Sequence, residues 1–469
     1  MTPLWSVAEV LAATGGRPVG LGDGAITAIS IDSRELPKGA LFIAIKGDTH
    51  DGHDFVAKAI EDGAAAALVS EEYFARVGGA WLIVVPDPLE ALNRLAEAAR
   101  ARSRARIAAV TGSAGKTTTK EAIRVVFEAL GETHASIRSF NNHWGVPLML
   151  ARLPREARYA VFEIGMNHAG EITPLVKLVR PHVAVITTVA AAHLEFFNSI
   201  SEIAEAKAEI FRGIEPGGVA VLNADHAYLH ILLSRARAAG VSRVVTYGFE
   251  ESADWRIDRY AETLEGADLQ IAHEGGRFAL ALKVKGRHMA ANALCALIVG
   301  RSLGGEPGAV SAALADFGAP EGRGLTQRLG PGTRPLLLVD ESYNANTASM
   351  RAALELFHGV KAPDGNKVLI LGDMLELGPQ SESLHVALAD SVAAAGAGAI
   401  HLVGPHMAAL AAALTGKKGL KARVTHYGDA AQLAETLSSA LAYGDAVMVK
   451  GSNGIRLGQI VKLIRERFR

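Results

Sequence analysis

The sequence predicts an α/β protein of three domains: a small α/β N-terminal domain, a central P-loop ATPase-type parallel sheet, and a C-terminal Rossmann-like doubly wound sheet. Three observations predict it. A glycine-rich loop joins an apolar strand to an amphipathic helix near residue 115, strands alternate with helices after this loop, and the alternation starts afresh beyond about Pro320. A chain of 469 residues is also too long for one hydrophobic core. We expect domains at residues 1–85, 86–320 and 321–469.

The composition is that of an ordinary soluble globular protein, with 49% hydrophobic and 21% charged residues. The formal net charge of -1 gives no electrostatic case for binding nucleic acid. No segment approaches about 18 clean apolar residues and the N-terminus lacks a signal pattern, so we expect no membrane insertion. The single cysteine, Cys295, excludes an intrachain disulfide. These features predict a cytoplasmic protein.

In the N-terminal domain, residues 40–45 are expected to form a buried strand with a polar turn on either side. The turns carry the sequences Asp32-Ser33-Arg34 and Asp51-Gly52-His53. Their side chains suit a phosphorylated or sugar-like ligand, although solvated loops would have the same composition. The candidate binding residues of this domain are Ser33, Arg34, Lys46, Gly47, Asp51 and His53.

The stretch IAAVTGSAGKTTTK, residues 107–120, is typical of a phosphate-binding loop, and an amphipathic helix at about residues 89–100 leads into it. Small residues let backbone N–H groups surround a polyphosphate at a helix N-terminus, where the helix dipole favours anions. Lys116 would reach the β- and γ-phosphates, and Thr117 would complete a Mg²⁺ shell. Val110 stands where the usual pattern has its first glycine, and a turn that merely caps a helix is the alternative. The expected nucleotide-binding residues here are Thr111, Gly112, Ser113, Ala114, Gly115, Lys116, Thr117 and Thr118.

The rest of the central domain is expected to alternate strands with helices, which favours a parallel sheet covered on both faces. After Glu250 the segments DLQIAHE and RFALALKV predict an antiparallel hairpin, and a helix at about residues 289–303 closes the domain. The expected parallel strands span residues 159–164, 183–187, 218–222 and 243–247.

The C-terminal domain repeats this alternation. Polar residues end three of its strands, at Asp340, Asp373 and Lys450, the edge at which open α/β sheets bind ligands. The expected strands span residues 335–340, 367–373, 399–404, 423–427 and 445–450.

Three residues of the central domain suit metal binding. Glu163 ends a strand parallel to the loop strand, where a carboxylate suits a nucleotide-bound Mg²⁺, although pairing with a lysine would suit it too. His193 follows the next strand. Lys207 falls on the apolar stripe of its helix, whereas Glu205 and Glu209 are expected to point away. Such a lysine either snorkels to water or loses its charge and takes up carbon dioxide as a carbamate, a metal ligand beside His193.

Three amides are further candidates. Asn141 and Asn142 precede a helix start, so they would either orient a polar substrate or close an Asx turn. Asn292 lies on the helix after Gly286-Arg287-His288, where it would contact an adenine edge or bond locally.

With these residues assembled, the chain resembles the Mur ligases, ATP-dependent amide-forming enzymes of peptidoglycan precursor synthesis, over nearly its full length. TGSAGKTTTK is similar to the family's phosphate loop, which also lacks the early glycine. Glu163, His193 and Lys207 fall on the family's metal-binding glutamate, histidine and carbamylated lysine, and the interval of 14 residues from His193 to Lys207 matches. The resemblance therefore implies the carbamate. Asn292 falls on an adenine-contacting asparagine, although Met289 replaces the asparagine common after GRH.

Within the family, four segments resemble those of the member that adds D-alanyl-D-alanine. They are DESYNANTASM (residues 340–350), in which Thr347 replaces the usual proline, LGDMLELG (residues 371–378), His385 and VKGS (residues 449–452). DSR and DGHDF resemble the segments that bind the uridine diphosphate sugar. The resemblance implies further ATP-binding residues, Arg323, Asp340 and Tyr343, and substrate-binding residues Asn141, Asn142, Asn344, Asn346, Lys450 and Ser452.

The resemblance implies that ATP, UDP-N-acetylmuramoyl-tripeptide and D-alanyl-D-alanine give the pentapeptide precursor, ADP and phosphate through an acyl phosphate. Lys116, Glu163, His193 and Lys207 would be the catalytic residues, with two Mg²⁺ ions bound by Thr117, Glu163, His193 and the carbamate. We expect a monomer whose outer domains close over the central one. The alternatives are another ligase of the superfamily, such as a folylpolyglutamate synthase, a P-loop nucleotide switch, or a small-molecule kinase.

Overall fold

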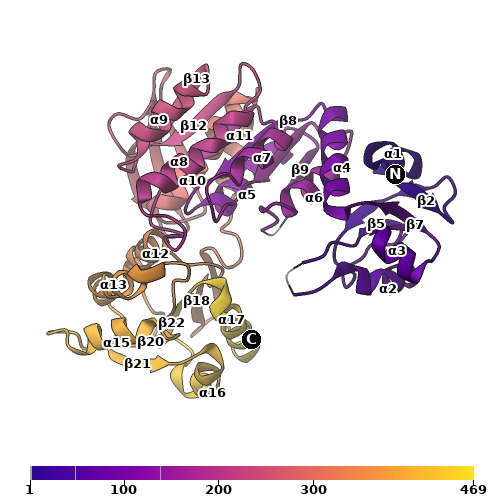
Figure 1. Ribbon diagram of the computed structural model, residues 1–469. Helices are drawn as coiled ribbons and strands as arrows, with labels where there is room; N and C mark the ends of the chain where they lie inside the picture. Colours follow the sequence, from indigo (N-terminus) through magenta and orange to yellow (C-terminus); the bar gives the residue numbers. More distant parts are fainter. Residues whose placement is uncertain (1–2, 48, 138) are drawn as a thin grey trace.

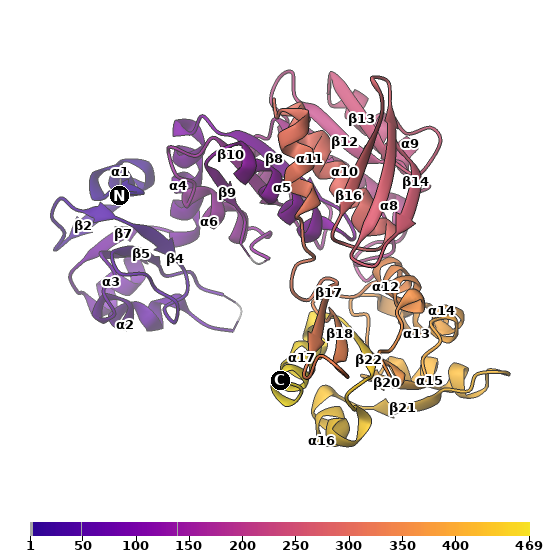
Figure 2. The same ribbon diagram turned by 180° about the vertical axis from the view of Figure 1, so that it is seen from behind.

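The computed structural model describes residues 3–47, 49–137 and 139–469. These residues form three sheet-bearing units that follow one another along the chain. The N-terminal unit lies to one side of the central unit, and the C-terminal unit lies below the central unit in both views (Figure 1, Figure 2). The predicted α/β class and three-part architecture are confirmed.

The N-terminal unit is built on a sheet of strand order β2-β7-β6-β5-β4, in which only β2 is antiparallel to its neighbour. The predicted buried strand is β5, which ends at Ile43, two residues early, because the chain then turns so that Gly52 N donates to Ile45 O. The elements are β1 Trp5–Ser6, α1 Val7–Thr14, β2 Arg17–Val19, β3 Ala25–Ile26, β4 Ala28–Ser30, β5 Ala40–Ile43, η1 Gly52–Phe55, α2 Val56–Glu61, β6 Ala66–Ser70, α3 Glu71–Val77 and β7 Leu82–Val85.

The central unit has the strand order β16-β15-β14-β13-β12-β11-β8-β10-β9, parallel from β9 to β14 and antiparallel at β15 and β16. Its strands are β8 Arg106–Thr111, β9 Thr133–Ala135, β10 Tyr159–Glu163, β11 Val183–Ile186, β12 Val219–Asn223, β13 Arg243–Gly248, β14 Trp255–Glu262, β15 Ala267–His273 and β16 Gly276–Leu282. Its helices are α4 Pro88–Arg102, α5 Lys116–Leu130, α6 Gly145–Ala151, α7 Ile172–Val179, α8 Ile200–Ala208, η2 Glu209–Gly213, α9 Leu229–Ala238, α10 Arg287–Ser302 and α11 Pro307–Ala315.

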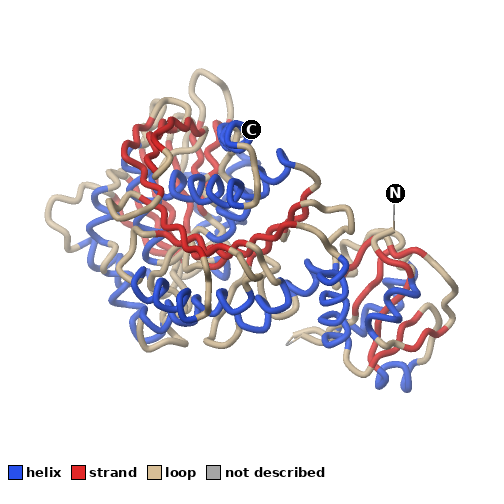
Figure 3. Tube along the Cα trace, turned by 90° about the horizontal axis from the view of Figure 1, so that it is seen from above, coloured by secondary structure: helices blue, strands red, loops and turns tan. Residues whose placement is uncertain are grey.

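Helices cover both faces of the central sheet, as predicted (Figure 3). Because side chains alternate along a strand, Ala108 and Val110 of β8 pack into one core with α5 and α10, while Ile107 and Ala109 pack into the other with α6 and α7. The predicted hairpin is confirmed as β15 and β16. Two predictions for this unit were incomplete. The strand β14 was not predicted, because Ile257 is its one buried residue, and the unit ends with α11 and not with α10.

The C-terminal unit has the strand order β17-β18-β22-β19-β20-β21, all parallel except β17. The predicted strands are present with ends shifted by at most one residue, but the half-exposed edge strand β17 was missed. The elements are β17 Leu325–Leu329, β18 Leu336–Glu341, α12 Thr347–Gly359, β19 Lys367–Gly372, η3 Gly378–Gln380, α13 Ser381–Val386, α14 Ala389–Ala394, β20 Ala399–Val403, α15 Met407–Thr415, β21 Arg423–Tyr427, α16 Ala430–Ala440, β22 Ala446–Lys450, η4 Asn453–Ile455 and α17 Leu457–Arg467.

The helix α4 joins the N-terminal and central units through both of its faces. Leu92 and Leu95 pack into the core of the N-terminal unit, whereas Ala96 packs into the central core. Trp5 Nε1 adds a hydrogen bond of 2.9 Å to Ala151 O of the central unit. Apolar packing therefore fixes these two units to each other.

The parallel pairing of β8 with β10 and β11 places the candidate site residues at one edge of the central sheet. Glu163 at the end of β10 lies opposite Val110 of β8, and Ile186 at the end of β11 lies opposite Thr111. The phosphate loop, Glu163 and the loop after β11 consequently leave the same edge of the sheet. None of the helices in the described part of the chain is both long enough and apolar enough to span a lipid bilayer.

Candidate active site

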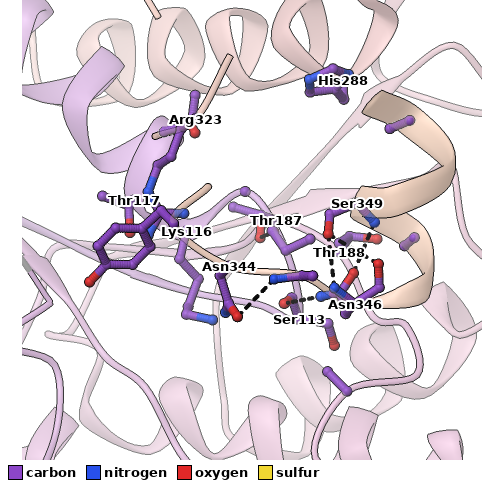
Figure 4. A pocket seen from close by; sticks show the side chains of 18 of the residues that line it. Ser113, Lys116, Thr117, Thr187, Thr188, His288, Arg323, Asn344, Asn346 and Ser349 are labelled. Atoms are coloured by element: carbon purple, nitrogen blue, oxygen red, sulfur yellow. Dashed lines mark hydrogen bonds between the residues drawn. The ribbon is translucent and has the colours of Figure 1, made fainter. Parts of the chain in front are cut away.

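A cavity of about 670 Å³ lies between the central and C-terminal units (Figure 4). The phosphate loop lines it from the central unit, and the YNAN segment (residues 343–346) lines it from the C-terminal unit. The predicted site residues on its wall are Ser113, Ala114, Gly115, Lys116, Thr117, Thr118, Asn141, Glu163, His193, Asn292, Arg323, Tyr343, Asn344, Asn346, Lys450 and Ser452.

The phosphate loop closes on itself at the N-terminus of α5. Lys116 Nζ donates to Gly112 O at 2.8 Å, and Gly115 caps the helix in the left-handed region with φ of 82°. Thr187, at the end of β11, donates to Ala114 O at 2.5 Å and so ties the loop to the sheet. Burial lowers the pKa of Lys116, and Glu163 partly offsets this effect. The arrangement offers backbone N–H groups and one cation to an anion at the helix N-terminus.

Glu163 is buried and held by two uncharged donors. Thr117 Oγ1 donates to Glu163 Oε2 at 2.7 Å, and Asn141 Nδ2 donates to Glu163 Oε1 at 2.8 Å. A carboxylate beside a hydroxyl is an oxygen donor set of the kind that Mg²⁺ prefers. In the part of the chain that the structure describes, no group of three or more His, Cys, Asp and Glu side chains could hold a metal ion. The single carboxylate and the hydroxyl beside it fit a Mg²⁺ that would take its remaining ligands from phosphate oxygens and water.

His193 meets a carboxylate from the other unit. Its Nδ1 lies 2.5 Å from Glu376 Oε2, and this bond is the main reason why the pKa of Glu376 is lowered. Glu376 also lines the cavity. Glu376 was not among the predicted site residues, although it belongs to the LGDMLELG segment, because an acidic loop residue has no distinctive local pattern and its role depends on the contact between the two units.

Lys207 is 1% exposed on α8, so the snorkelling alternative is wrong. Among the described residues its amine has no hydrogen-bond or ion-pair partner, and it does not line the cavity. Burial, together with repulsion from Lys116, holds the pKa of Lys207 well below its usual value. This environment favours a neutral amine, which is the form that reacts with carbon dioxide.

The expectation that Glu209 points away is also wrong, because Glu209 is buried. Its carboxylate accepts hydrogen bonds from Gly170 N at 2.6 Å and from Thr173 N at 3.0 Å. These donors belong to the start of α7, where unpaired N–H groups attract a carboxylate. Glu205, by contrast, is exposed and pairs with Arg235, as expected.

The C-terminal unit touches the phosphate loop directly. Asn346 Nδ2 donates to Ser113 O at 3.0 Å (Figure 4), and Tyr343 is hydrogen-bonded to Ser139. The Arg323 guanidinium lies 4.2 Å from the centroid of the Tyr343 ring. Lys450 Nζ donates to Glu341 Oε2 at 3.2 Å and to Asn344 O at 3.0 Å, which positions the YNAN segment.

Some predicted residues lie off the cavity wall. Asn142 accepts a hydrogen bond from Gly145 N at 2.9 Å, so it closes the Asx turn of the alternative interpretation. Asp340 is 1% exposed, and its carboxylate accepts from Ser342, Gly322 and Arg465. Asp373 likewise caps α15 through Met407 N. Thr111 and Gly112 also lie behind the wall.

The N-terminal candidates divide into two groups. Lys46, Asp51 and His53 line a second cavity of about 440 Å³. There His53 Nδ1 lies 2.7 Å from Asp51 Oδ1, while His53 Nε2 accepts from Ser70 N at 3.0 Å. Ser33, Arg34 and Gly47 do not line this cavity, and the exposed Arg34 pairs with Asp32 instead.

Several wall residues were not predicted. Phe249 and Arg287 both line the cavity, and the Arg287 guanidinium lies 3.6 Å from the centroid of the Phe249 ring. Some of the other residues could have been found from their place at strand ends. Thr187 and Thr188 follow β11, and Glu341 is the last residue of β18, so all three lie at the carboxyl edge of a sheet. The unpredicted polar residues include Thr187, Thr188, Glu341, Ser349 and Glu376.

Comparison with known proteins agrees with this geometry. Three family models match: the Mur ligase family catalytic domain at residues 25–100, the Mur ligase middle domain at 110–300, and the Mur ligase glutamate ligase domain at 327–453. The chain is 35% identical to the UDP-N-acetylmuramoyl-tripeptide--D-alanyl-D-alanine ligase of Escherichia coli, across 94% of both chains. It is 33% identical to that of Rickettsia prowazekii, across 92% of this chain and 94% of the relative.

Solved structures give the same result. The MurF of Acinetobacter baumannii superposes with a TM-score of 0.84 at 28% identity, covering 98% of this chain and 99% of that one. The MurF of Thermotoga maritima, solved in complex with ADP, shares the fold with a TM-score of 0.77 at 24% identity, covering 94% and 97% of the two chains. Since the family models match all three sheet-bearing units and the relatives match almost the whole length, this chain belongs to the Mur ligase family.

Proposed function

We propose that this chain is an ATP-dependent carbon–nitrogen ligase that joins D-alanyl-D-alanine to UDP-N-acetylmuramoyl-tripeptide. The observation that carries the proposal is one cavity in which the phosphate loop faces the YNAN segment, with Asn346 bonded to Ser113. The name shared by relatives at 33% and 35% identity supports this substrate pair. We also propose domain limits at residues 1–85, 86–320 and 321–469.

The first step is activation of the tripeptide. Its terminal carboxylate attacks the γ-phosphorus of ATP, the bond to the β-phosphate oxygen breaks, and ADP leaves from an acyl phosphate. Lys116 would move from Gly112 O to the phosphates and neutralise charge on the transferring group. Loop N–H groups at the start of α5 hold the phosphates. Asn292, beside Gly115 and Thr119, would contact the adenine.

The second step forms the amide. The dipeptide amine attacks the acyl carbon, phosphate leaves from the tetrahedral intermediate, and the ammonium proton is lost to solvent or a nearby base. The YNAN segment, held by Lys450, would bind the dipeptide against the phosphate loop. Docking of the C-terminal unit excludes water, which would otherwise hydrolyse the acyl phosphate.

We propose two Mg²⁺ ions, held by Thr117 and Glu163 and by His193 with a carbamate on Lys207. When bound, they supply charge neutralisation to the phosphates. The buried amine of Lys207, which lacks a partner among the described residues and has a lowered pKa, supports the carbamate. Loss of activity in Lys207→Ala with partial rescue by short-chain carboxylates would support it, and no rescue would count against it.

The N-terminal unit would anchor the sugar end of the substrate. The second cavity, with Lys46, Asp51 and His53, would hold the uridine diphosphate sugar, and Ser33, Arg34 and Gly47 would reach it only through a change in their loops. Small molecules are the only partners that the proposed reaction needs. The cytoplasmic location and the monomeric state stay predictions.

An amine-acceptor screen tests the function. Phosphate release should require ATP, the muramoyl tripeptide and D-alanyl-D-alanine together. Other dipeptides and free amino acids, tested in place of D-alanyl-D-alanine, should give no release. Release without an acceptor would favour a nucleotide switch. ADP production without free phosphate would favour a kinase, and release with glutamate and a folate would favour a folylpolyglutamate synthase.

A further inference from the structure

Two strained turns meet at the boundary between the central and C-terminal units. His193 has φ of 56° and Glu376 has φ of 62°, a backbone region that non-glycine residues rarely adopt. Such conformations are strained, and they persist where the surroundings hold them. Both strained residues line the cavity.

The two turns hold each other. The carboxylate of Glu376 lies 2.5 Å from His193 Nδ1, and the backbone carbonyl of Glu376 accepts from Glu195 N at 3.2 Å. The approach is close, because a Cβ added to Gly378 would lie 3.1 Å from Glu195 Cα. Side chain and main chain therefore fix Glu376 against the loop of His193.

The Glu376 turn is at the same time anchored to the C-terminal unit. Leu375 N donates to Ser452 Oγ at 3.0 Å, and Met374 N donates to His385 Nε2 at 3.0 Å. His385 is fully buried. The position of the Glu376 carboxylate is consequently set by the C-terminal unit as a body.

This contact has a chemical consequence for the imidazole. When Nδ1–H donates to a carboxylate, the proton is fixed on Nδ1, and the lone pair of Nε2 is left for a ligand. Carboxylate–histidine pairs of this kind orient metal-binding imidazoles and raise their basicity. Here the carboxylate and the histidine come from different units.

We propose that Glu376 is a positioning residue that orients His193 for a divalent cation and so couples docking of the C-terminal unit to binding of that cation. The inference rests on the proposed function, in which His193 is a metal ligand. Coupling of this kind is reciprocal: docking strengthens cation binding, and the cation strengthens docking to the same degree.

The test uses the full chain with Mn²⁺ in place of Mg²⁺ and the β,γ-methylene analogue of ATP. Electron paramagnetic resonance measures the number and affinity of bound Mn²⁺ ions, and small-angle X-ray scattering measures the radius of gyration with and without the ion. The variants are Glu376→Ala, the near-isosteric Glu376→Gln, and Glu195→Gln as the matched control. The Glu195→Gln substitution also removes one negative charge from the contact between the two turns, but the side chain of Glu195 is exposed.

In Glu376→Ala we expect the weaker-binding Mn²⁺ ion to lose about 10- to 100-fold in affinity, the usual effect of removing such a partner. Glu376→Gln should lose less, because an amide oxygen still accepts the hydrogen bond, although more weakly than a carboxylate. The compaction caused by Mn²⁺ should shrink in both variants and persist in Glu195→Gln.

Unchanged Mn²⁺ affinity in Glu376→Ala would overturn the inference, even if scattering showed a looser chain, because Glu376 would then be a latch with no effect on the metal. An equal loss in Glu195→Gln would also overturn it, since the effect would be one of local charge. These readouts do not require turnover. A chain that fails the acceptor screen but shows the expected Mn²⁺ pattern would therefore disprove the proposed reaction and leave the coupling standing.

Discussion

The backbone at Gly112 has φ of 152°, and an added Cβ would lie 2.0 Å from the Thr187 hydroxyl oxygen. Thr187 is the residue that ties the phosphate loop to β11 through Ala114 O. A side chain at position 112 would therefore push on the contact that shapes the loop, in addition to straining the backbone. At the scale of single residues, the loop depends on the absence of one methyl group.

Gly112→Ala should lower stability by about 3 kcal/mol, from steric overlap plus backbone strain, and should abolish stabilisation by ADP and Mg²⁺. Thermal unfolding with and without ADP measures both effects. Gly276→Ala is the control, because Gly276 also has positive φ (118°) but an added Cβ there meets nothing within 4 Å. Equal losses in the two variants, with the ADP effect intact, would contradict the steric account.

Lys116→Ala should abolish phosphate release while leaving binding of the uridine diphosphate sugar largely intact, because the second cavity is lined by other residues. Turnover assays and calorimetric titration of the muramoyl tripeptide give the two readouts. Lys177→Ala, at an exposed lysine of α7, is the matched control. Full activity of Lys116→Ala would refute the nucleotide assignment.

At the scale of one element, α8 carries a buried amine on its apolar face. Burial holds the pKa of Lys207 in the folded protein well below 10.5. Between the folded and unfolded pKa values the unfolded chain binds one proton more, so this residue makes stability rise with pH. A bound carbamate would remove the penalty.

Lys207→Met should therefore melt a few degrees higher than the parent chain at pH 7 in bicarbonate-free buffer. The substitution removes the cost of burying the amine, which should raise the free energy of unfolding by on the order of 1–2 kcal/mol. The difference should shrink as the pH approaches 10.5. Added bicarbonate should stabilise the parent chain but not Lys207→Met. A variant that melts lower than the parent at neutral pH would show that the lysine has a stabilising partner.

The elements that the sequence predicted well are those buried on both sides. Strands such as β8 and β10 are continuous apolar runs, and a run of this kind ends where the side chains become polar. The strands β14 and β17 were missed because one face of each is exposed and their sequences lack a clear alternation. The helix α11 has Pro307 in its first turn and Glu306 as its cap, a signal that was present but not used.

The site was predictable where a local pattern encodes it, as in the phosphate loop. Glu376 and the role of Asn346 against Ser113 depend on two units meeting, and no spacing within one element reports such a contact. Asp340 shows the converse case: its place at a strand end predicts ligand binding, whereas in this structure its buried carboxylate accepts a hydrogen bond from Gly322 N.

At the scale of the whole molecule, the C-terminal unit meets the central unit through polar contacts such as Tyr343–Ser139 and Asn346–Ser113, and through Leu384 of α13, which packs against the central core. Tyr343→Phe keeps the ring that Arg323 covers and removes one hydrogen bond, worth about 1 kcal/mol. A loss of this size should lower the equilibrium ratio of molecules with a docked C-terminal unit to molecules with an undocked one by about fivefold. Small-angle scattering measures the shift, with Tyr228→Phe as the control. An unchanged profile would mean that other contacts suffice.

The helix α4 commits one face to each of two cores, with Leu92 and Leu95 on one side and Ala96 on the other. Moving the N-terminal unit would expose the apolar surface of α4 that is buried in one of these cores, whereas moving the C-terminal unit would exchange hydrogen bonds for water and expose Leu384. We therefore expect the C-terminal unit, and not the N-terminal unit, to be the one that moves. In the proposed reaction, the sugar end of the substrate would stay in one place while the C-terminal unit brought the incoming amine to it.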